Sequence, residues 1–264
     1  MDRRDLAVGL LVLVTVVVAS FAVVTVWSAP SGPLATDQTY PPGAEADHIN
    51  FSALDTSDAN LTHTPRKHWD SYAIRYTAPS ERRLVEGEYY INSTTGEIIA
   101  DRWHDATVYR NGTVYAYRQP VESIPEQQRE QFDSDPQFVY DDATDAYYRY
   151  DPRYGQLAPT NIGRHTMLLD SYTWEAVDTT THHGVPVITY RATGTRSDSS
   201  GAPVINGTLR LGVDDGLVYG YDFTQDTEGE AYRYTYSVEP APFPEHEWVG
   251  TARDLAANST DSSS

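Results

Sequence analysis

Cysteine is absent from this chain of 264 residues, and lysine occurs only once. Without cysteine the protein has no disulfide framework, no thiolate zinc site, no cysteine nucleophile and no cysteine-linked lipid anchor. Positive charge is scarce as well, because 19 Lys and Arg face 38 Asp and Glu, which gives a formal net charge of −19. Such an acidic chain is a poor match for nucleic acid or for electrostatic docking on anionic lipid.

One apolar stretch dominates the N-terminus. The 22 residues from Leu6 to Trp27 carry no charge, and as a helix they would reach about 33 Å, enough to cross a bilayer core of about 30 Å. Arg3 and Arg4 precede the stretch, and the next basic residue is Arg66. The positive-inside rule then predicts a cytoplasmic N-terminus and an extracellular C-terminal domain.

The alternative for this stretch is a cleaved export signal, whose apolar region usually has about 7–15 residues. The length of the stretch favours an uncleaved, single-pass signal anchor. We therefore predict a cytoplasmic stub (1–5), a transmembrane helix (6–27), a Pro/Gly-rich tether (28–45), a β-rich extracytoplasmic domain (46–250) and a polar tail (251–264).

Alternating polar and apolar residues in the β-rich domain predict a consecutive antiparallel meander, and the fold class is α+β, mainly antiparallel β. The expected strands are 71–77, 88–91, 97–100, 107–110, 113–117, 172–176, 187–195, 208–213, 217–223 and 232–238. The Asn111-Gly112 pair is a strong hairpin signal. A short helix within 46–55 and a capped helix from Ser123 to Phe132 interrupt the pattern, and Asp133–Gly155 is expected to be irregular.

Six of the seven asparagines lie in Asn-x-Ser/Thr sequons, where chance would give about one. They are Asn50, Asn60, Asn92, Asn111, Asn206 and Asn258. This excess predicts a glycosylated surface. For Asn111-Gly112-Thr113 and Asn206-Gly207-Thr208 the alternative is simple turn chemistry.

Candidate chemistry is sparse. The chain has no G-x-S-x-G, dinucleotide-binding or P-loop motif, so we predict no enzyme and no cofactor. The histidines, including His182-His183 and His246, lack the spacing of a zinc site. The aspartates between Asp133 and Asp145 lack that of a calcium loop. We therefore predict no metal site.

Aromatic residues on two neighbouring predicted strands can share one face of the sheet. They are Tyr219, Tyr221, Phe223, Tyr232, Tyr234 and Tyr236. Tyrosine combines a large apolar area with a polar tip, so these rings are candidates to line a pocket for a lipid-like or other apolar ligand. The alternative is a packed sheet core, and with it a structural or interaction glycoprotein of the cell surface with no ligand.

Three stretches resemble a known family. Val108–Tyr117 and Gly207–Tyr221 are similar to hairpins of LolA-like lipoprotein carriers, and Phe243–Val249 is similar to the closing segment of haloarchaeal membrane-anchored surface proteins. The resemblance implies a curved, incomplete barrel with short lid helices, whose cavity holds acyl chains in the carriers. It offers no catalytic residues to carry over. Many haloarchaeal relatives carry a lipid-anchoring cysteine that this chain lacks, which leaves the helix as its anchor.

The composition also predicts a dependence on salt. With 24 Asp, 14 Glu and a single Lys, the chain has the composition of a halophilic protein, and its carboxylates repel one another in dilute buffer. At about 1 M salt the screening length falls to about 3 Å, which removes most of this repulsion. We expect the folded chain to lose structure in low salt. A circular dichroism melt that is unchanged between low and molar salt would contradict this.

Overall fold

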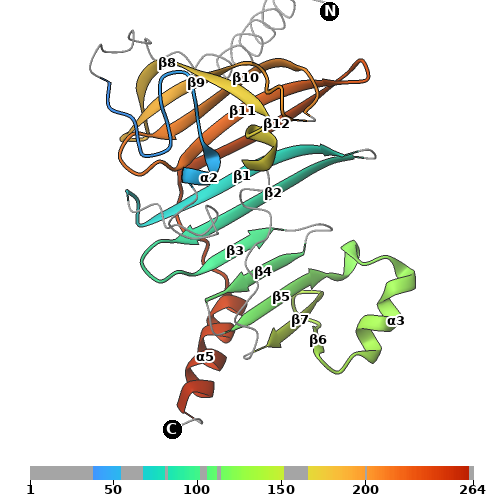
Figure 1. Cartoon of the computed structure of the whole chain (residues 1–264). Helices are drawn as coiled ribbons and strands as arrows, with labels where there is room; N and C mark the ends of the chain where they lie inside the picture. Colours follow the sequence, from blue (N-terminus) through green and yellow to red (C-terminus); the bar gives the residue numbers. More distant parts are fainter. Residues whose placement is uncertain are drawn as a thin grey trace, which may run out of the picture.

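A computed structural model describes residues 38–54, 68–80, 83–101, 106–111, 114–151, 166–199 and 201–261. Within these ranges twelve strands form one open, antiparallel sheet with a few short helices (Figure 1). The mainly antiparallel β class is thereby confirmed. The predicted transmembrane segment 6–27 lies outside the described residues, and no helix within them has the length and apolar character needed to span a membrane.

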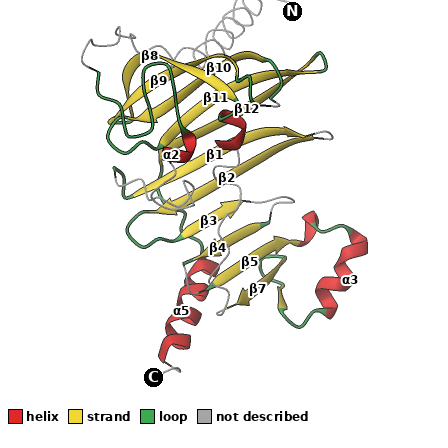
Figure 2. Cartoon of the chain, in the orientation of Figure 1, coloured by secondary structure: helices red, strands yellow, loops and turns green. Residues whose placement is uncertain are grey.

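The strands follow the alternation expected from the sequence, and most of them are longer than predicted. They are β1 (Ser71–Ser80), β2 (Arg83–Asn92), β3 (Ile98–Asp101), β4 (Thr107–Arg110), β5 (Tyr115–Pro120), β6 (Phe138–Asp141), β7 (Ala146–Asp151), β8 (Tyr172–His182), β9 (Val185–Thr195), β10 (Val204–Gly212), β11 (Val218–Thr227) and β12 (Glu230–Pro240). The helices lie around the sheet (Figure 2) and are α2 (Phe51–Leu54), the 3-10 turn η2 (Val121–Ser123), α3 (Glu126–Ser134), α4 (Thr166–Leu169) and α5 (Glu247–Asp261).

The strand order is β6-β7-β5-β4-β3-β2-β1-β12-β11-β10-β9-β8. The first strand, β1, therefore lies near the middle of the sheet, and the strands β2 to β7 form one half of it, with β6 at the edge. The next strand, β8, lies at the opposite edge. The chain then returns to the middle, where β12 pairs with β1 in a register that sets Tyr76 opposite Tyr236. The predicted consecutive meander holds within β8–β12 and from β1 to β5, but a long-range pairing joins the two halves.

Both faces of the sheet carry a core. In the β3–β4 pairing, Ile98 and Ala100 lie on one face with Val108, while Ile99 and Tyr109 lie on the other. Since successive strand residues point to opposite faces, the larger cluster, which runs from β8 to β5, and the smaller one, which includes Trp248 and Val249 of α5, are on opposite faces. We call these the inner face and the outer face.

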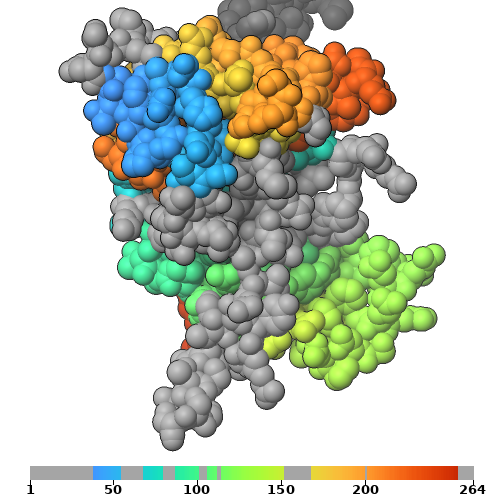
Figure 3. Space-filling model, viewed as in Figure 1, coloured from blue at the N-terminus to red at the C-terminus, as the bar shows by residue number. Residues whose placement is uncertain are grey.

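Residues 38–54 cover part of the inner face (blue in Figures 1 and 3). Ile49 and Phe51 are buried in the inner core. The Ala46 carbonyl accepts a hydrogen bond of 2.7 Å from the Ala176 amide of β8. Residues 38–45, which the sequence assigns to the tether, are also packed against the domain, because Ala44 is buried in the inner core and the Tyr190 hydroxyl donates to the Glu45 carbonyl at 3.1 Å.

On the half of the sheet that α5 does not cover, the outer face carries cross-strand ion pairs. Arg75 of β1 lies 2.6 Å from Glu88 and 3.5 Å from Glu239, and Arg191 of β9 lies 3.2 Å from Glu175. These side chains are 31–61% exposed, so each pair adds little stability, about 0–1 kcal/mol. They show that this part of the outer face is a charged, solvated surface.

The segment Asp133–Gly155, expected to be irregular, contains strands β6 and β7. Tyr147 and Tyr148 of β7 are both buried although they point to opposite faces. A strand that buries both faces lacks polar alternation, which is why the sequence prediction was wrong here.

The predicted capped helix from Ser123 to Phe132 is displaced. The helix α3 starts at Glu126 with Pro125 as its N-cap residue, and η2 precedes it. The Ser123 hydroxyl donates to the Pro120 carbonyl at 2.8 Å and is not a helix cap. The turn alternative for Asn206-Gly207-Thr208 is also wrong, since these residues lie inside β10.

The predicted polar tail, 251–264, is helical as far as Asp261 because α5 runs through its first eleven residues. Ala252 of this helix is fully buried in the outer core. The packed domain consequently extends beyond residue 250.

Candidate binding pocket

The six predicted pocket aromatics lie on the inner face together, but one of them is not part of its core. Tyr219, Tyr221, Phe223 and Tyr236 are buried members of the inner core, and Tyr234 packs against that core. Tyr232 is half-buried, and its hydroxyl donates to Glu230 at 3.0 Å. Among the described residues, then, most of these rings pack as core, and their role as a ligand site stays a prediction.

Contacts among the rings show how closely this face is filled. Tyr221 and Tyr236 stack with centroids 5.3 Å apart, and Tyr172 lies 4.4 Å from Phe223. Burial raises the pKa of Tyr172 to about 12, and its hydroxyl donates to Gln225 at 2.8 Å. Gly207, opposite Phe223, leaves room for that ring, since an added Cβ would lie 2.6 Å from it.

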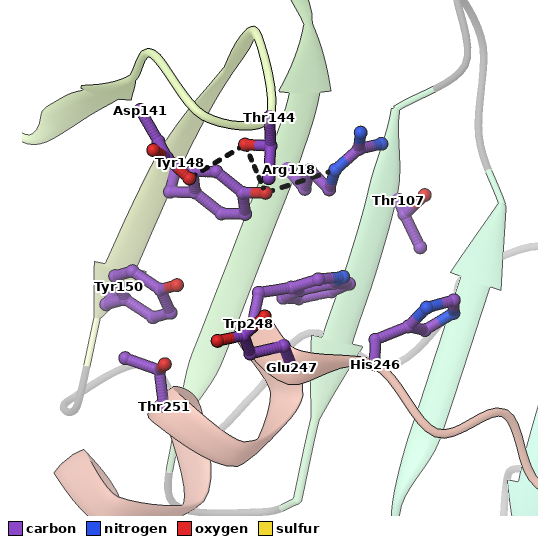
Figure 4. A pocket seen from close by; sticks show the side chains of 10 residues that line it. All are labelled: Thr107, Arg118, Asp141, Thr144, Tyr148, Tyr150, His246, Glu247, Trp248 and Thr251. Atoms are coloured by element: carbon purple, nitrogen blue, oxygen red, sulfur yellow. Dashed lines mark hydrogen bonds between the residues drawn. The ribbon is translucent and has the colours of Figure 1, made fainter.

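A pocket of about 480 Å³ lies on the outer face, between α5 and strands β4, β5 and β7 (Figure 4). Its lining combines aromatic rings with hydroxyl, guanidinium and carboxylate groups: Thr107, Arg118, Asp141, Thr144, Tyr148, Tyr150, His246, Glu247, Trp248 and Thr251. This volume is within the range of small-molecule sites. We call it the α5 pocket.

Strand register explains why these residues meet. Thr107 is opposite Arg118 on β5, and Arg118 is opposite Tyr148 on β7, so the three side chains form a row across the outer face. Next to this row, Ala116 is opposite Tyr150. Ala116 is fully buried, and its small side chain leaves room for α5 to pack on the sheet.

The rings form two nearly parallel pairs. Tyr148 and Tyr150 have planes 4° apart with centroids separated by 6.2 Å, and His246 and Trp248 have planes 21° apart at 6.0 Å. Trp248 joins the two pairs, because its ring lies 6.4 Å from Tyr148. Tyr150 is half-buried and His246 is exposed, so part of the aromatic surface faces solvent.

A chain of hydrogen bonds crosses one wall of the pocket. Arg118 Nε donates to the Tyr148 hydroxyl at 3.3 Å, and the Thr144 hydroxyl donates to Asp141 Oδ2 at 2.8 Å. Since the Thr144 proton is used on Asp141, the Tyr148 hydroxyl must donate to Thr144 across their 3.0 Å contact. Within the described residues Arg118 has no carboxylate within 4 Å, so this relay is its described polar link to the wall.

The helix α5 is fixed to the sheet by a buried carboxylate. Glu97, only 6% exposed, accepts hydrogen bonds from Arg253 of α5 at 2.6 and 3.1 Å, from the Tyr109 hydroxyl at 2.5 Å and from the Thr95 hydroxyl at 2.8 Å. Burial alone would raise the pKa of Glu97, but these donors outweigh it and hold the pKa below its ordinary value. We call this group the Glu97 clamp.

The histidine and aspartate side chains considered as metal ligands in the sequence have other hydrogen-bond partners. His182 is buried with Nε2 2.6 Å from the Val238 carbonyl, and burial lowers its pKa. Asp133 and Asp145 accept hydrogen bonds from Tyr147 and Tyr140. No group of three His, Cys, Asp or Glu side chains suited to a metal ion occurs in the described part of the chain.

Three sequon asparagines use the side-chain oxygen in local turns. Asn50 Oδ1 accepts a hydrogen bond from the Ala53 amide, and Asn92 Oδ1 accepts from the amides of Thr94 and Thr95. Asn111 Oδ1 accepts from the Val114 amide. Asn206 is exposed on β10. Asn60 and the side chain of Asn258 lie outside the described residues. Glycosylation itself stays a prediction.

No protein-family model matches the chain, and no curated protein matches its sequence. Similar solved structures include MucB in complex with MucA(peri) (13% identity, 75% of this chain, TM-score 0.29) and MucA/MucB of Pseudomonas aeruginosa (13%, 76%, 0.31). The chain spans 58% and 60% of those two chains. A LolA-superfamily protein of Nitrosomonas europaea is also similar (13%, 66% of this chain, 86% of that chain, TM-score 0.20). With TM-scores this low, the likenesses say nothing about activity.

The Glu97 clamp leads to a prediction about stability and pH. Glu97→Gln should lower the free energy of unfolding by about 1–3 kcal/mol, because Arg253 loses its charged partner but keeps contact with solvent. A folded-state pKa below the ordinary value stabilises the fold above about pH 4.5, and this contribution disappears as the pH falls through the lowered pKa. Thermal melts in molar salt at several pH values would measure both effects.

The matched control is Glu175→Gln, which removes one partner of the exposed Arg191 pair and should change stability by about 0.5 kcal/mol or less. Equal losses in the two variants would contradict a special role for the clamp.

Proposed function

We propose that this chain is a non-catalytic binding module of the cell envelope, held at the outer surface of the membrane by the helix 6–27. The α5 pocket is its binding site, and the observation that carries the proposal is the combination of aromatic and polar groups there. The Glu97 clamp supports it, because a helix fixed by a buried ion pair keeps a pocket wall in place without a ligand.

The polar groups of the pocket favour binding over chemistry. The Thr144 hydroxyl is committed to Asp141, and the Tyr148 hydroxyl to Thr144. His246 stacks on Trp248. Hydroxyls arranged in a relay that ends on a carboxylate hold one another in position, which suits recognition of a ligand.

The extracytoplasmic location rests on the charge-free stretch, the preceding Arg3 and Arg4, and the six sequons. In this proposal α2 and α4 are the short lid helices of an incomplete barrel. The second candidate is a surface glycoprotein with a filled core and no ligand. The close packing of Tyr221, Tyr236 and Phe223 on the inner face favours it.

Protease added to intact cells tests the location. The domain from residue 46 onward should be degraded without lysis, because it would lie outside the membrane, and immunoblotting of the C-terminal region measures the loss. Digestion of a cytoplasmic protein in the same cells is the control for leakage. A domain that stays intact until lysis would contradict the proposed topology.

Native mass spectrometry of the full chain, released from its membrane, tests binding. We expect a bound small molecule on the wild type and its loss in Thr251→Trp, because the larger ring would fill the α5 pocket. Gln128→Trp, an exposed position on α3, should retain it. Absence of any adduct on the wild type would favour the glycoprotein with a filled core.

A further inference from the structure

The α5 pocket presents hydrogen-bond donors and acceptors around aromatic rings. Arg118 supplies guanidinium donors, and Asp141 and Glu247 supply carboxylate acceptors. The exposed residue Thr251 adds a hydroxyl that is hydrogen-bonded to Tyr150. Figure 4 shows Tyr150 and Thr251 near one another, with Trp248 between them and His246. A ligand that fits this lining must offer both donors and acceptors, together with an apolar surface.

Most small-molecule classes fail one of these requirements. A quaternary ammonium ion suits the rings and the carboxylates but would meet the guanidinium of Arg118. A carboxylate or phosphate suits Arg118 but would meet Asp141 and Glu247 in a chain of net charge −19. A purely apolar molecule would strip water from all of these polar groups without replacing its hydrogen bonds.

A pyranose ring meets all three requirements: it offers donors, acceptors and an apolar surface. Each of its hydroxyls both donates and accepts, which allows bonds to a guanidinium and a carboxylate at once. The C–H groups on one side of the ring form an apolar, slightly positive face that packs on the negative face of an aromatic ring. About one or two such rings fit a pocket of 480 Å³.

We propose that the α5 pocket binds a neutral saccharide, with a pyranose ring against Tyr150 and its hydroxyls between Arg118 and the carboxylates of Asp141 and Glu247. This inference rests on the proposed function and names the ligand class of the same site. The sugar can be free or the end of a glycan, since both present the same ring.

Saturation-transfer NMR on the full chain in nanodiscs tests this, with glucose, galactose and mannose, each beside its methyl glycoside. We expect saturation transfer to at least one hexose, with a Kd on the order of millimolar for this one-ring probe, weaker than for a complete ligand that stays bound in native mass spectrometry. Because the ligand is neutral, its Kd should change less than about twofold between 1 and 3 M NaCl. Binding of the hexose but not of its methyl glycoside would indicate a free sugar, and binding of the glycoside as well would indicate the end of a glycan.

Variants separate the site from the rest of the surface. Tyr150→Ala should weaken binding about tenfold or more by removing the ring, while Tyr150→Phe should stay within about threefold. Glu247→Ala, at an exposed position on α5, should also weaken binding, and it provides the test if Tyr150→Ala does not fold. Tyr40→Ala, at a half-buried tyrosine that packs against the inner core and does not line the pocket, should bind as the wild type does.

The inference is overturned if no hexose shows saturation transfer to folded protein, or if neither Tyr150→Ala nor Glu247→Ala weakens it. Tetramethylammonium and acetate are the competing probes, and tighter binding of either would also overturn it. An adduct in native mass spectrometry that is not a saccharide would leave the binding module standing and reject only the ligand class. Absence of any adduct, together with absence of hexose binding, would reject both.

Discussion

The ion pair between Glu97 and Arg253 fixes α5 on the outer face of the sheet and so determines the shape of the α5 pocket. A carboxylate buried just before β3 needs several donors to remain charged. Tyr109 of β4 and Thr95 of the β2–β3 turn supply two of them. The third comes from α5, about 150 residues further along the chain. The ion pair thereby fixes the helix, and with the helix the positions of His246, Glu247, Trp248 and Thr251.

The two cores illustrate how one sheet can support different surfaces. Between β8 and β12 the inner face is apolar and the outer face carries ion pairs, which is the usual arrangement of an antiparallel sheet with one solvated face. From β3 to β7 both faces are covered, so tyrosines and small residues replace the polar positions. This is why Ala116 and Ala146 lie fully buried in the outer core, and why the sequence of β7 was predicted to be an irregular, tyrosine-rich segment.

Local signals predicted much of the fold. The turns at Gly96, Asn111 and Gly216 place three hairpins correctly, because turn chemistry and strand alternation act over a few residues. The pairing of β1 with β12 was beyond such reasoning, since it joins residues about 160 positions apart. Alternation also grouped Tyr219, Tyr221, Phe223, Tyr234 and Tyr236 on one face, but it could not tell a packed core from a cavity.

The α5 pocket was missed for a physical reason. Its lining comes from four separate stretches that only the sheet register brings together, and among these residues His246 was considered only as a histidine without the spacing of a zinc site. The one available signal was the spacing of Trp248, Val249 and Ala252, which gives α5 an apolar side. Read alone, that pattern predicts a docked helix but not the groups it would meet.

In the described part of the chain the twelve-stranded sheet ends in two edge strands, and the outward backbone groups of an edge strand are a template for joining other chains. One edge, β6, has only four residues. The other, β8, is long, but its pairing with β9 is irregular in two places, after Thr173 and after Ala176, and Ala46 covers the amide of Ala176. Neither edge offers a long, straight row of free amides. These edges therefore disfavour pairing of the edge strands of one copy with those of the next, which would build a fibre.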